Sequence, residues 1–176
     1  PVQGSMVGDD DDEAVVSGFV ESYLAAQAKL ANEALDRLSV QGVQDMDTVR
    51  ARFDGAAAGA REFLMPDGEA DRARIGLLFI ESYRELPLLA WPRTLIDAVV
   101  GLEEAMLLWR STHARMVERM IGRRVGTGGS SGVDYLDATT KYRVFGDLWT
   151  VRTLLIKKEA LPPLANPHFY GFAGEA

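Results

Sequence analysis

Hydrophobic residues recur at three- and four-residue steps over much of this chain, and the longest such run lies between residues 93 and 122. Six of the regularly spaced residues are apolar, and one histidine lies among them. In order they are Val99, Leu102, Met106, Trp109, His113, Met116 and Met120. Because an α-helix has about 3.6 residues per turn, side chains at this spacing lie on one face. The pattern predicts a long helix, with Pro92 in its first turn and Gly122 as its C-cap.

Other segments have the same helical spacing. They are residues 14–38, 45–65, 71–86 and 133–158, the last of them long enough for two helices. Asp47 or Thr48 is the predicted N-cap of the second segment, because a short polar side chain can accept hydrogen bonds from free backbone amides. The chain has no internal repeat and no alternating strand pattern. The sequence therefore predicts an all-α fold.

The chain divides into three predicted parts. Residues 1–13 combine a stretch typical of a tag remnant with an acidic run, which is either a solvated arm or the charged start of the first helix. Residues 14–160 are the predicted helical domain, since 176 residues suffice for one buried core. Residues 161–176 contain prolines that oppose helix formation, and they predict an extended C-terminal tail.

The amino-acid composition argues against several classes of binding partner. With 19 Lys and Arg against 26 Asp and Glu, the net charge of −7 argues against nucleic acid, whose phosphates need clustered cations. The absence of cysteine excludes disulfides and thiolate ligands and fits a reducing compartment. No apolar run reaches the roughly 18 to 20 residues of a membrane-spanning helix. We therefore expect a cytoplasmic protein without nucleic-acid or membrane partners.

The run "GTGGSSG" at residues 126–132 interrupts the helical pattern. Its glycines would let backbone N–H groups converge on an anion, as in a phosphate-binding nest. It lacks the lysine of a Walker A loop, and a helix rather than a strand precedes it, unlike a dinucleotide-binding turn. Its composition is also typical of a flexible linker. The helical patterns on both sides favour a loop between two packed helices, able to order around a carboxylate or an ammonium group.

His113 and His168 are the only histidines. A neutral imidazole is a good ligand for iron or zinc, and an apolar wall with one inward histidine is what the proximal side of a haem requires. The same pattern is typical of a core histidine that is hydrogen-bonded to the backbone. Zinc is disfavoured, because the chain has no cysteine and no second histidine one turn away from His113. The residues alone leave the core and the haem interpretations open.

The stretch "LEEAMLLWRSTHARMVERMIGRRVGTGGSSGVDYL", followed by "FGDLWTVRTLL", resembles the C-terminal half of the tryptophan 2,3-dioxygenase superfamily. The resemblance covers about Tyr83 to Leu155. It implies an all-α helical bundle of that type, in a short or truncated version, with haem b as cofactor. It further implies an oxygenase that acts with O2 on tryptophan or a related aromatic amino acid or indole. Members of the family assemble from several copies, so the resemblance also implies a homo-oligomer, a dimer or a tetramer.

The resemblance assigns roles to the cofactor site. The histidine of "WRSTH" is the proximal haem ligand in the family, so His113 would bind the haem iron, with Trp109 beside it. Ser130 and Ser131 would approach the substrate or a haem propionate. Three arginines that follow on the same helix or just after it could also reach propionates; they are Arg119, Arg123 and Arg124.

The resemblance also assigns a substrate contact. The threonine of the glycine run, Thr127, would contact the amino-acid end of the substrate, and Gly126 and Gly128 would shape the loop. The family's distal histidine and its carboxylate-binding arginine lie far upstream of the haem helix, but the 112 residues before His113 contain no histidine. Either these groups belong to a missing part, or the distal chemistry differs, or a neighbouring chain completes the pocket. The alternatives to an oxygenase are a non-catalytic haem or small-ligand-binding protein and a helical interaction domain.

Overall fold

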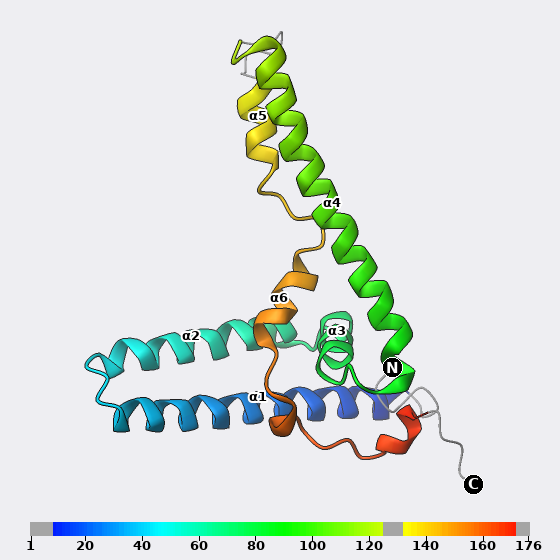
Figure 1. Ribbon diagram of the computed structural model, residues 1–176. Coiled ribbons are helices and arrows are strands. Elements are labelled where there is room, and N and C mark those ends of the chain that lie inside the picture. The colour runs from blue at the N-terminus through cyan, green and yellow to red at the C-terminus, as the bar shows by residue number, and fades with distance from the viewer. Residues whose placement is uncertain (1–8, 125–131, 172–176) are drawn as a thin grey trace. The chain divides into compact units, whose positions relative to one another are not determined.

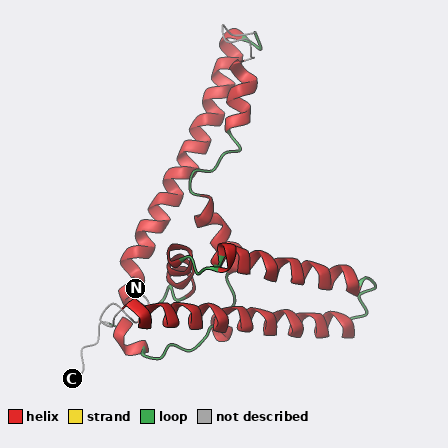
Figure 2. Cartoon of the chain, turned by 180° about the vertical axis from the view of Figure 1, so that it is seen from behind, coloured by secondary structure: helices red, strands yellow, loops and turns green. Residues whose placement is uncertain are grey.

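The computed structural model describes residues 9–124 and 132–171, and over these residues the chain forms helices and loops without a strand (Figure 2). The α-helices are α1 (Asp9–Val40), α2 (Met46–Leu64), α3 (Arg72–Ser82), α4 (Ala90–Ile121), α5 (Gly132–Thr139) and α6 (Gly146–Leu154). Short 3-10 segments adjoin them, namely η1 (Pro66–Gly68), η2 (Pro87–Leu89), η3 (Lys158–Ala160) and η4 (Pro167–Tyr170). The predicted all-α class is confirmed.

The ends of α2 and α4 show where local sequence signals succeed. Gly122 has φ +65° directly after α4, which is the left-handed conformation that glycine adopts at little cost, so its prediction as the C-cap is confirmed. The predicted cap of α2 at Asp47 or Thr48 is wrong. The N-cap is Asp45, whose carboxylate accepts a hydrogen bond of 3.1 Å from the amide of Thr48.

Helix α3 ends at Ser82, earlier than the hydrophobic spacing predicts. Leu86 is already extended, at φ −73° and ψ 125°, because the ring of Pro87 disfavours helical geometry in the residue before it. Pro92 lies in the first turn of α4, as predicted, where its missing N–H would have no helical acceptor.

The described residues form two compact units. The first contains the residues up to Trp91 together with those from Thr150 onward, and the second is Pro92–Trp149. The hydrophobic pattern predicted no boundary between two units. The reason is that each boundary falls inside a continuous helix, the first near the start of α4 and the second within α6.

The core of the first unit lies where α3 and the C-terminal half of α6 pack against the hairpin of α1 and α2 (Figure 1). Its buried members include Val20, Tyr23, Ala60, Phe63, Leu64, Ile75, Leu78, Val151 and Leu154. The hydroxyl of Tyr23 donates a hydrogen bond of 3.0 Å to the carbonyl of Leu154. This bond joins α1 to the last residue of α6, which lies far away in the sequence.

Aromatic rings extend this packing toward the C-terminal segment. Phe79 of α3 contacts the rings of Phe19, Tyr83 and Tyr170 at centroid distances of 5.6, 4.8 and 5.5 Å. The sequence predicted an extended tail from residue 161. Within that tail η4 is a short helical turn with a proline at its start, and its Tyr170 is buried. The described part of the tail is thus anchored to the core through one aromatic side chain.

In the second unit, α5 runs alongside the C-terminal half of α4 (Figure 1). Ala114 of α4 and Val133 of α5 are fully buried. Around them, Arg115 pairs with Asp137, and a guanidinium nitrogen of Arg110 donates a hydrogen bond of 3.1 Å to the carbonyl of Tyr142. The ion pair fixes the register of α5 against α4, and the hydrogen bond holds the loop that follows α5.

Candidate cofactor-ligand site on helix α4

Helix α4 has two chemically different sides. The side that faces α5 and the following loop buries Glu103 and Ala114. The other side carries His113 and a row of large apolar side chains that are exposed. We call this row the open stripe; its apolar members are Leu102, Met106, Trp109, Met116 and Met120. The predicted apolar stripe of α4 therefore exists, but within its own unit its members from Leu102 to Met120 are exposed apart from the half-buried His113.

His113 is half-buried within the open stripe, and its imidazole stacks on the indole of Trp109. The ring centroids are 5.4 Å apart and the ring planes differ by 10°. The two residues are one turn apart on α4, which places their side chains over one another. Among the described residues the imidazole has no hydrogen-bond partner, so a core histidine bonded to the backbone finds no support in the geometry.

The surroundings of His113 fit some ligands better than others. Within the described ranges, no group of three or more His, Cys, Asp or Glu side chains is placed to hold a metal ion, which disfavours a closed zinc site. A haem needs one axial nitrogen and a flat apolar surface against its macrocycle. A half-buried imidazole stacked on Trp109, between the exposed side chains of Met106 and Met116, offers both of these features. The residues present fit a haem.

The predicted loop residues Gly126, Thr127, Gly128, Ser130 and Ser131 lie outside the described residues. Both chain segments that flank them are described. Arg123, just before them, forms ion pairs of 3.0 Å with Glu118 and 2.6 Å with Asp134, and α5 begins directly after them. The resemblance implied that Arg123 could reach a haem propionate, but in the structure its guanidinium binds carboxylates of α4 and α5.

Sequence reasoning missed Glu103, which is 1% exposed although it carries a carboxylate. One of its oxygens accepts hydrogen bonds from the backbone N–H groups of Val144 and Phe145, the latter at 2.8 Å, and the other accepts from the indole N–H of Trp149. The backbone N–H of Phe145 is the largest cause that lowers the pKa of Glu103, with further lowering by Trp149, Val144 and Arg143. All the donors come some forty residues later in the chain, so no local spacing could have predicted them.

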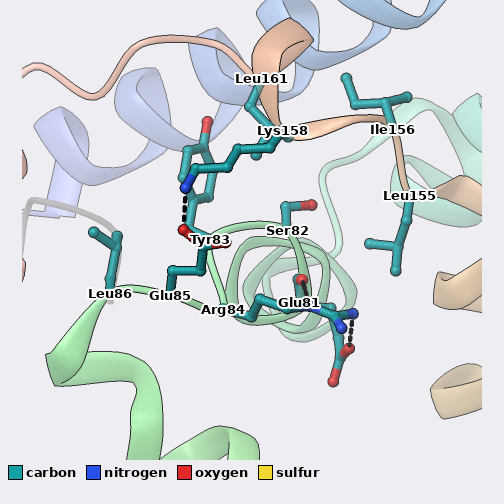
Figure 3. A pocket seen from close by; sticks show the side chains of 10 residues that line it. All are labelled: Glu81, Ser82, Tyr83, Arg84, Glu85, Leu86, Leu155, Ile156, Lys158 and Leu161. Carbon is teal, nitrogen blue, oxygen red and sulfur yellow. Dashed lines mark hydrogen bonds and ion pairs between the residues drawn. The ribbon is translucent and has the colours of Figure 1, made fainter.

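A cavity of about 500 Å³ lies in the first unit, around the C-terminal end of α3 (Figure 3). It is lined by Glu81, Ser82, Tyr83, Arg84, Glu85, Leu86, Leu155, Ile156, Lys158 and Leu161. Its charges are paired, Arg84 with Glu81 and Lys158 with Glu85, and the hydroxyl of Tyr83 donates to the carbonyl of Pro162 at 2.6 Å. None of the predicted site residues lines this cavity, so we place the candidate site on α4.

Fold and site together define an all-helical protein that presents one imidazole on an apolar helix face. A family model described as tryptophan 2,3-dioxygenase matches residues 10–155. The chain belongs to the tryptophan 2,3-dioxygenase family. The match also covers α1 and α2, which lie ahead of the segment where the motifs of the sequence alone suggested the family.

Several proteins with similar sequences are described as tryptophan 2,3-dioxygenases or as tryptophan 2,3-dioxygenase-like. The chain is 47% identical to a tryptophan 2,3-dioxygenase-like protein of Xanthomonas campestris pv. campestris, over 99% of this chain and 67% of the relative. It is 46% identical to tryptophan 2,3-dioxygenase 2 of Ralstonia nicotianae, over the whole chain and 50% of the relative. For tryptophan 2,3-dioxygenase of Sorangium cellulosum the identity is 47%, over 99% of this chain and 44% of the relative. The chain thus spans between 44% and 67% of the lengths of these proteins.

No helix within the described ranges is both long and apolar enough to cross a membrane.

Proposed function

We propose that this chain is the haem-ligating part of an oxygenase that acts on tryptophan or a related aromatic amino acid or indole. The reaction proposed is the insertion of oxygen from O2 into the aromatic ring system of the substrate. One observation carries the proposal: a single imidazole, His113, lies in an exposed apolar stripe with an indole stacked on it. Membership of the tryptophan 2,3-dioxygenase family supports the substrate class.

His113 is the proposed axial ligand of haem b. Its position one turn from Trp109 limits the rotation of the imidazole, because the stacked indole occupies one side of the ring. Met106 and Met116 flank it along the helix and provide apolar, adaptable contact surface for a macrocycle. The haem supplies the binding and activation of O2 when it is bound. The protein contributes orientation of the ligand and exclusion of water from the apolar face.

Thr127 is the proposed polar contact to the amino-acid end of the substrate, with Gly126 and Gly128 allowing close approach of the backbone. Ser130 and Ser131 are proposed to contact the substrate or a propionate. These assignments rest on the resemblance to the family, and the described neighbours on both sides, Arg123 and Asp134, form an ion pair of 2.6 Å.

Replacement of His113 tests the ligand assignment. We expect the purified chain, titrated with haem, to give a Soret band that is lost in His113→Gly and returns on addition of free imidazole, which can fill the vacated position. His168→Ala is the matched control, because His168 is the other histidine of the chain and is exposed. An unchanged Soret band in His113→Gly would reject His113 as the ligand.

A non-catalytic haem-binding role is the second candidate. It is favoured by the composition of α4, which carries no histidine beside His113 that could serve as a second imidazole in proton transfer. Turnover separates the two candidates. An oxygenase in its ferrous state should convert L-tryptophan, or another aromatic amino acid, in air to an oxygenated product detectable by mass spectrometry. A binder should give the Soret band of the first experiment without any product.

A further inference from the structure

Glu103 lies on α4 next to the open stripe, and its carboxylate binds residues 144–149, which follow α5. At 100° per residue, Glu103 lies about 80° around the helix axis from His113 and about 15 Å along it. Its carboxylate binds the residues from Val144 to Trp149 at both ends, through two backbone amides and one indole. These residues therefore lie beside the open stripe and not on it.

The residues that Glu103 holds are themselves apolar and poorly covered. Val144 is 61% exposed, and Phe145 is also exposed. Together with Leu95 and Val99 of α4 they line a cavity of about 540 Å³. Since burial of apolar surface is favourable by about 25 cal/mol per Å², such side chains tend to cover any exposed apolar neighbour that they can reach. Along α4, Leu102 directly precedes Glu103 and Met106 lies one turn after it, so the part of the open stripe beside this segment begins with these two residues.

We propose that Glu103 is a positioning residue for the His113 site: its carboxylate holds residues 144–149 on one flank of α4 and so prevents them from collapsing onto the open stripe. The inference rests on the proposed function for the role of His113, but the position of the segment is testable without haem.

The chemistry of the contact explains why a carboxylate is needed there. All three partners are N–H donors, and a carboxylate is an acceptor at both of its oxygens. An amide at the same position can accept at only one atom, so its NH2 group would face a donor and that contact would be lost. Arg143 adds to the preference for a negative charge, because its guanidinium lies 3.7 Å from Glu103 and also 3.8 Å from the ring centre of Trp149.

The first test uses the chain without haem. In a ¹H–¹⁵N spectrum each of the three tryptophans gives one indole N–H signal, which single Trp→Phe variants assign. A soluble paramagnetic agent should broaden the signal of the exposed Trp109 in the wild type. In Glu103→Ala, which removes all three contacts, the Trp149 signal should move because its acceptor is lost, and Trp109 should become protected from the agent. Glu104→Ala is the matched control, because Glu104 is the neighbouring residue and is exposed.

The second test measures haem affinity in the same variants. Glu103→Ala should bind haem more weakly than the wild type, because residues 144–149 would then compete with haem for the open stripe, while Glu104→Ala should match the wild type. Trp149→Phe, which keeps the carboxylate and removes one donor, should give a smaller loss and serves if Glu103→Ala does not fold. If Trp109 stays equally exposed in Glu103→Ala, the inference is wrong. If the wild type binds no haem, the proposed function fails, and the Trp109 signal still decides the role of Glu103.

Discussion

The bond between Tyr23 and Leu154 predicts a specific loss of stability on substitution of Tyr23 by Phe. Tyr23 is 1% exposed, and its hydroxyl donates at 3.0 Å to the carbonyl of the last residue of α6. Such a terminal carbonyl has no intrahelical partner. Phe keeps the ring, so no cavity forms, and the cost is that of the hydrogen bond. A hydrogen bond contributes about 1 kcal/mol net to the free energy of unfolding, and a buried carbonyl left without a donor costs about 1–3 kcal/mol. We therefore expect Tyr23→Phe to lower the free energy of unfolding by about 2 kcal/mol.

Urea unfolding followed by far-ultraviolet circular dichroism measures this loss. For a chain of this size, about 2 kcal/mol corresponds to a melting temperature lower by about 4–8 °C. Tyr135→Phe is the control, because Tyr135 is exposed and its substitution should leave the unfolding free energy unchanged within about 0.5 kcal/mol.

The same pair of proteins makes a pH-dependent prediction. Burial raises the pKa of Tyr23 above its ordinary value of 10.0, so the folded state favours the protonated hydroxyl. The stabilisation is therefore complete below about pH 10 and is lost as the pH rises through the raised folded pKa. The difference between wild type and Tyr23→Phe should therefore shrink as the pH rises above about 10. A loss below about 0.5 kcal/mol at neutral pH would refute the assigned role of the bond.

Three further outcomes test the packing and the electrostatics. Leu78→Ala should lower the free energy of unfolding by about 2–5 kcal/mol, because Leu78 is fully buried. Leu88→Ala, at an exposed site, should cost far less, and equal losses would contradict the assigned core. Asp71→Ala should cost about 1 kcal/mol in urea unfolding, because its carboxylate accepts from two free amides at the start of α3, and no loss would contradict that cap. The contacts of Glu103 are present above its ordinary pKa of 4.5 and should be lost as the pH falls through its lowered folded pKa. The indole N–H signal of Trp149 should therefore move only below about pH 4.5, and a midpoint at or above that value would contradict the contact.

Much of the fold followed from local patterns. The spacing of apolar residues predicted the long helix α4 together with its end at Gly122, because a glycine after a periodic run readily takes the left-handed C-cap conformation. The N-cap of α2 was misplaced, because Asp45, Asp47 and Thr48 are all short polar residues and only the folded backbone shows which of them caps the helix. The early end of α3 was missed because Leu86 continues the apolar pattern after the helix has stopped.

For the candidate site, too, the sequence determined some features and the tertiary structure decided others. The sequence by itself determined that His113 and Trp109 share one face of α4, since their spacing is one helical turn. It also carried the motifs that pointed to the family, which the comparison with known proteins established.

Only the tertiary structure decided which face of α4 is covered. Periodicity shows that apolar residues share a face, but not whether a neighbour buries that face. In the structure, α5 and the loop after it cover the flank of Glu103 and Ala114, and the open stripe around His113 remains exposed. The buried role of Glu103 was equally beyond the sequence, because its hydrogen-bond donors are brought to it only when residues 144–149 fold back along the helix.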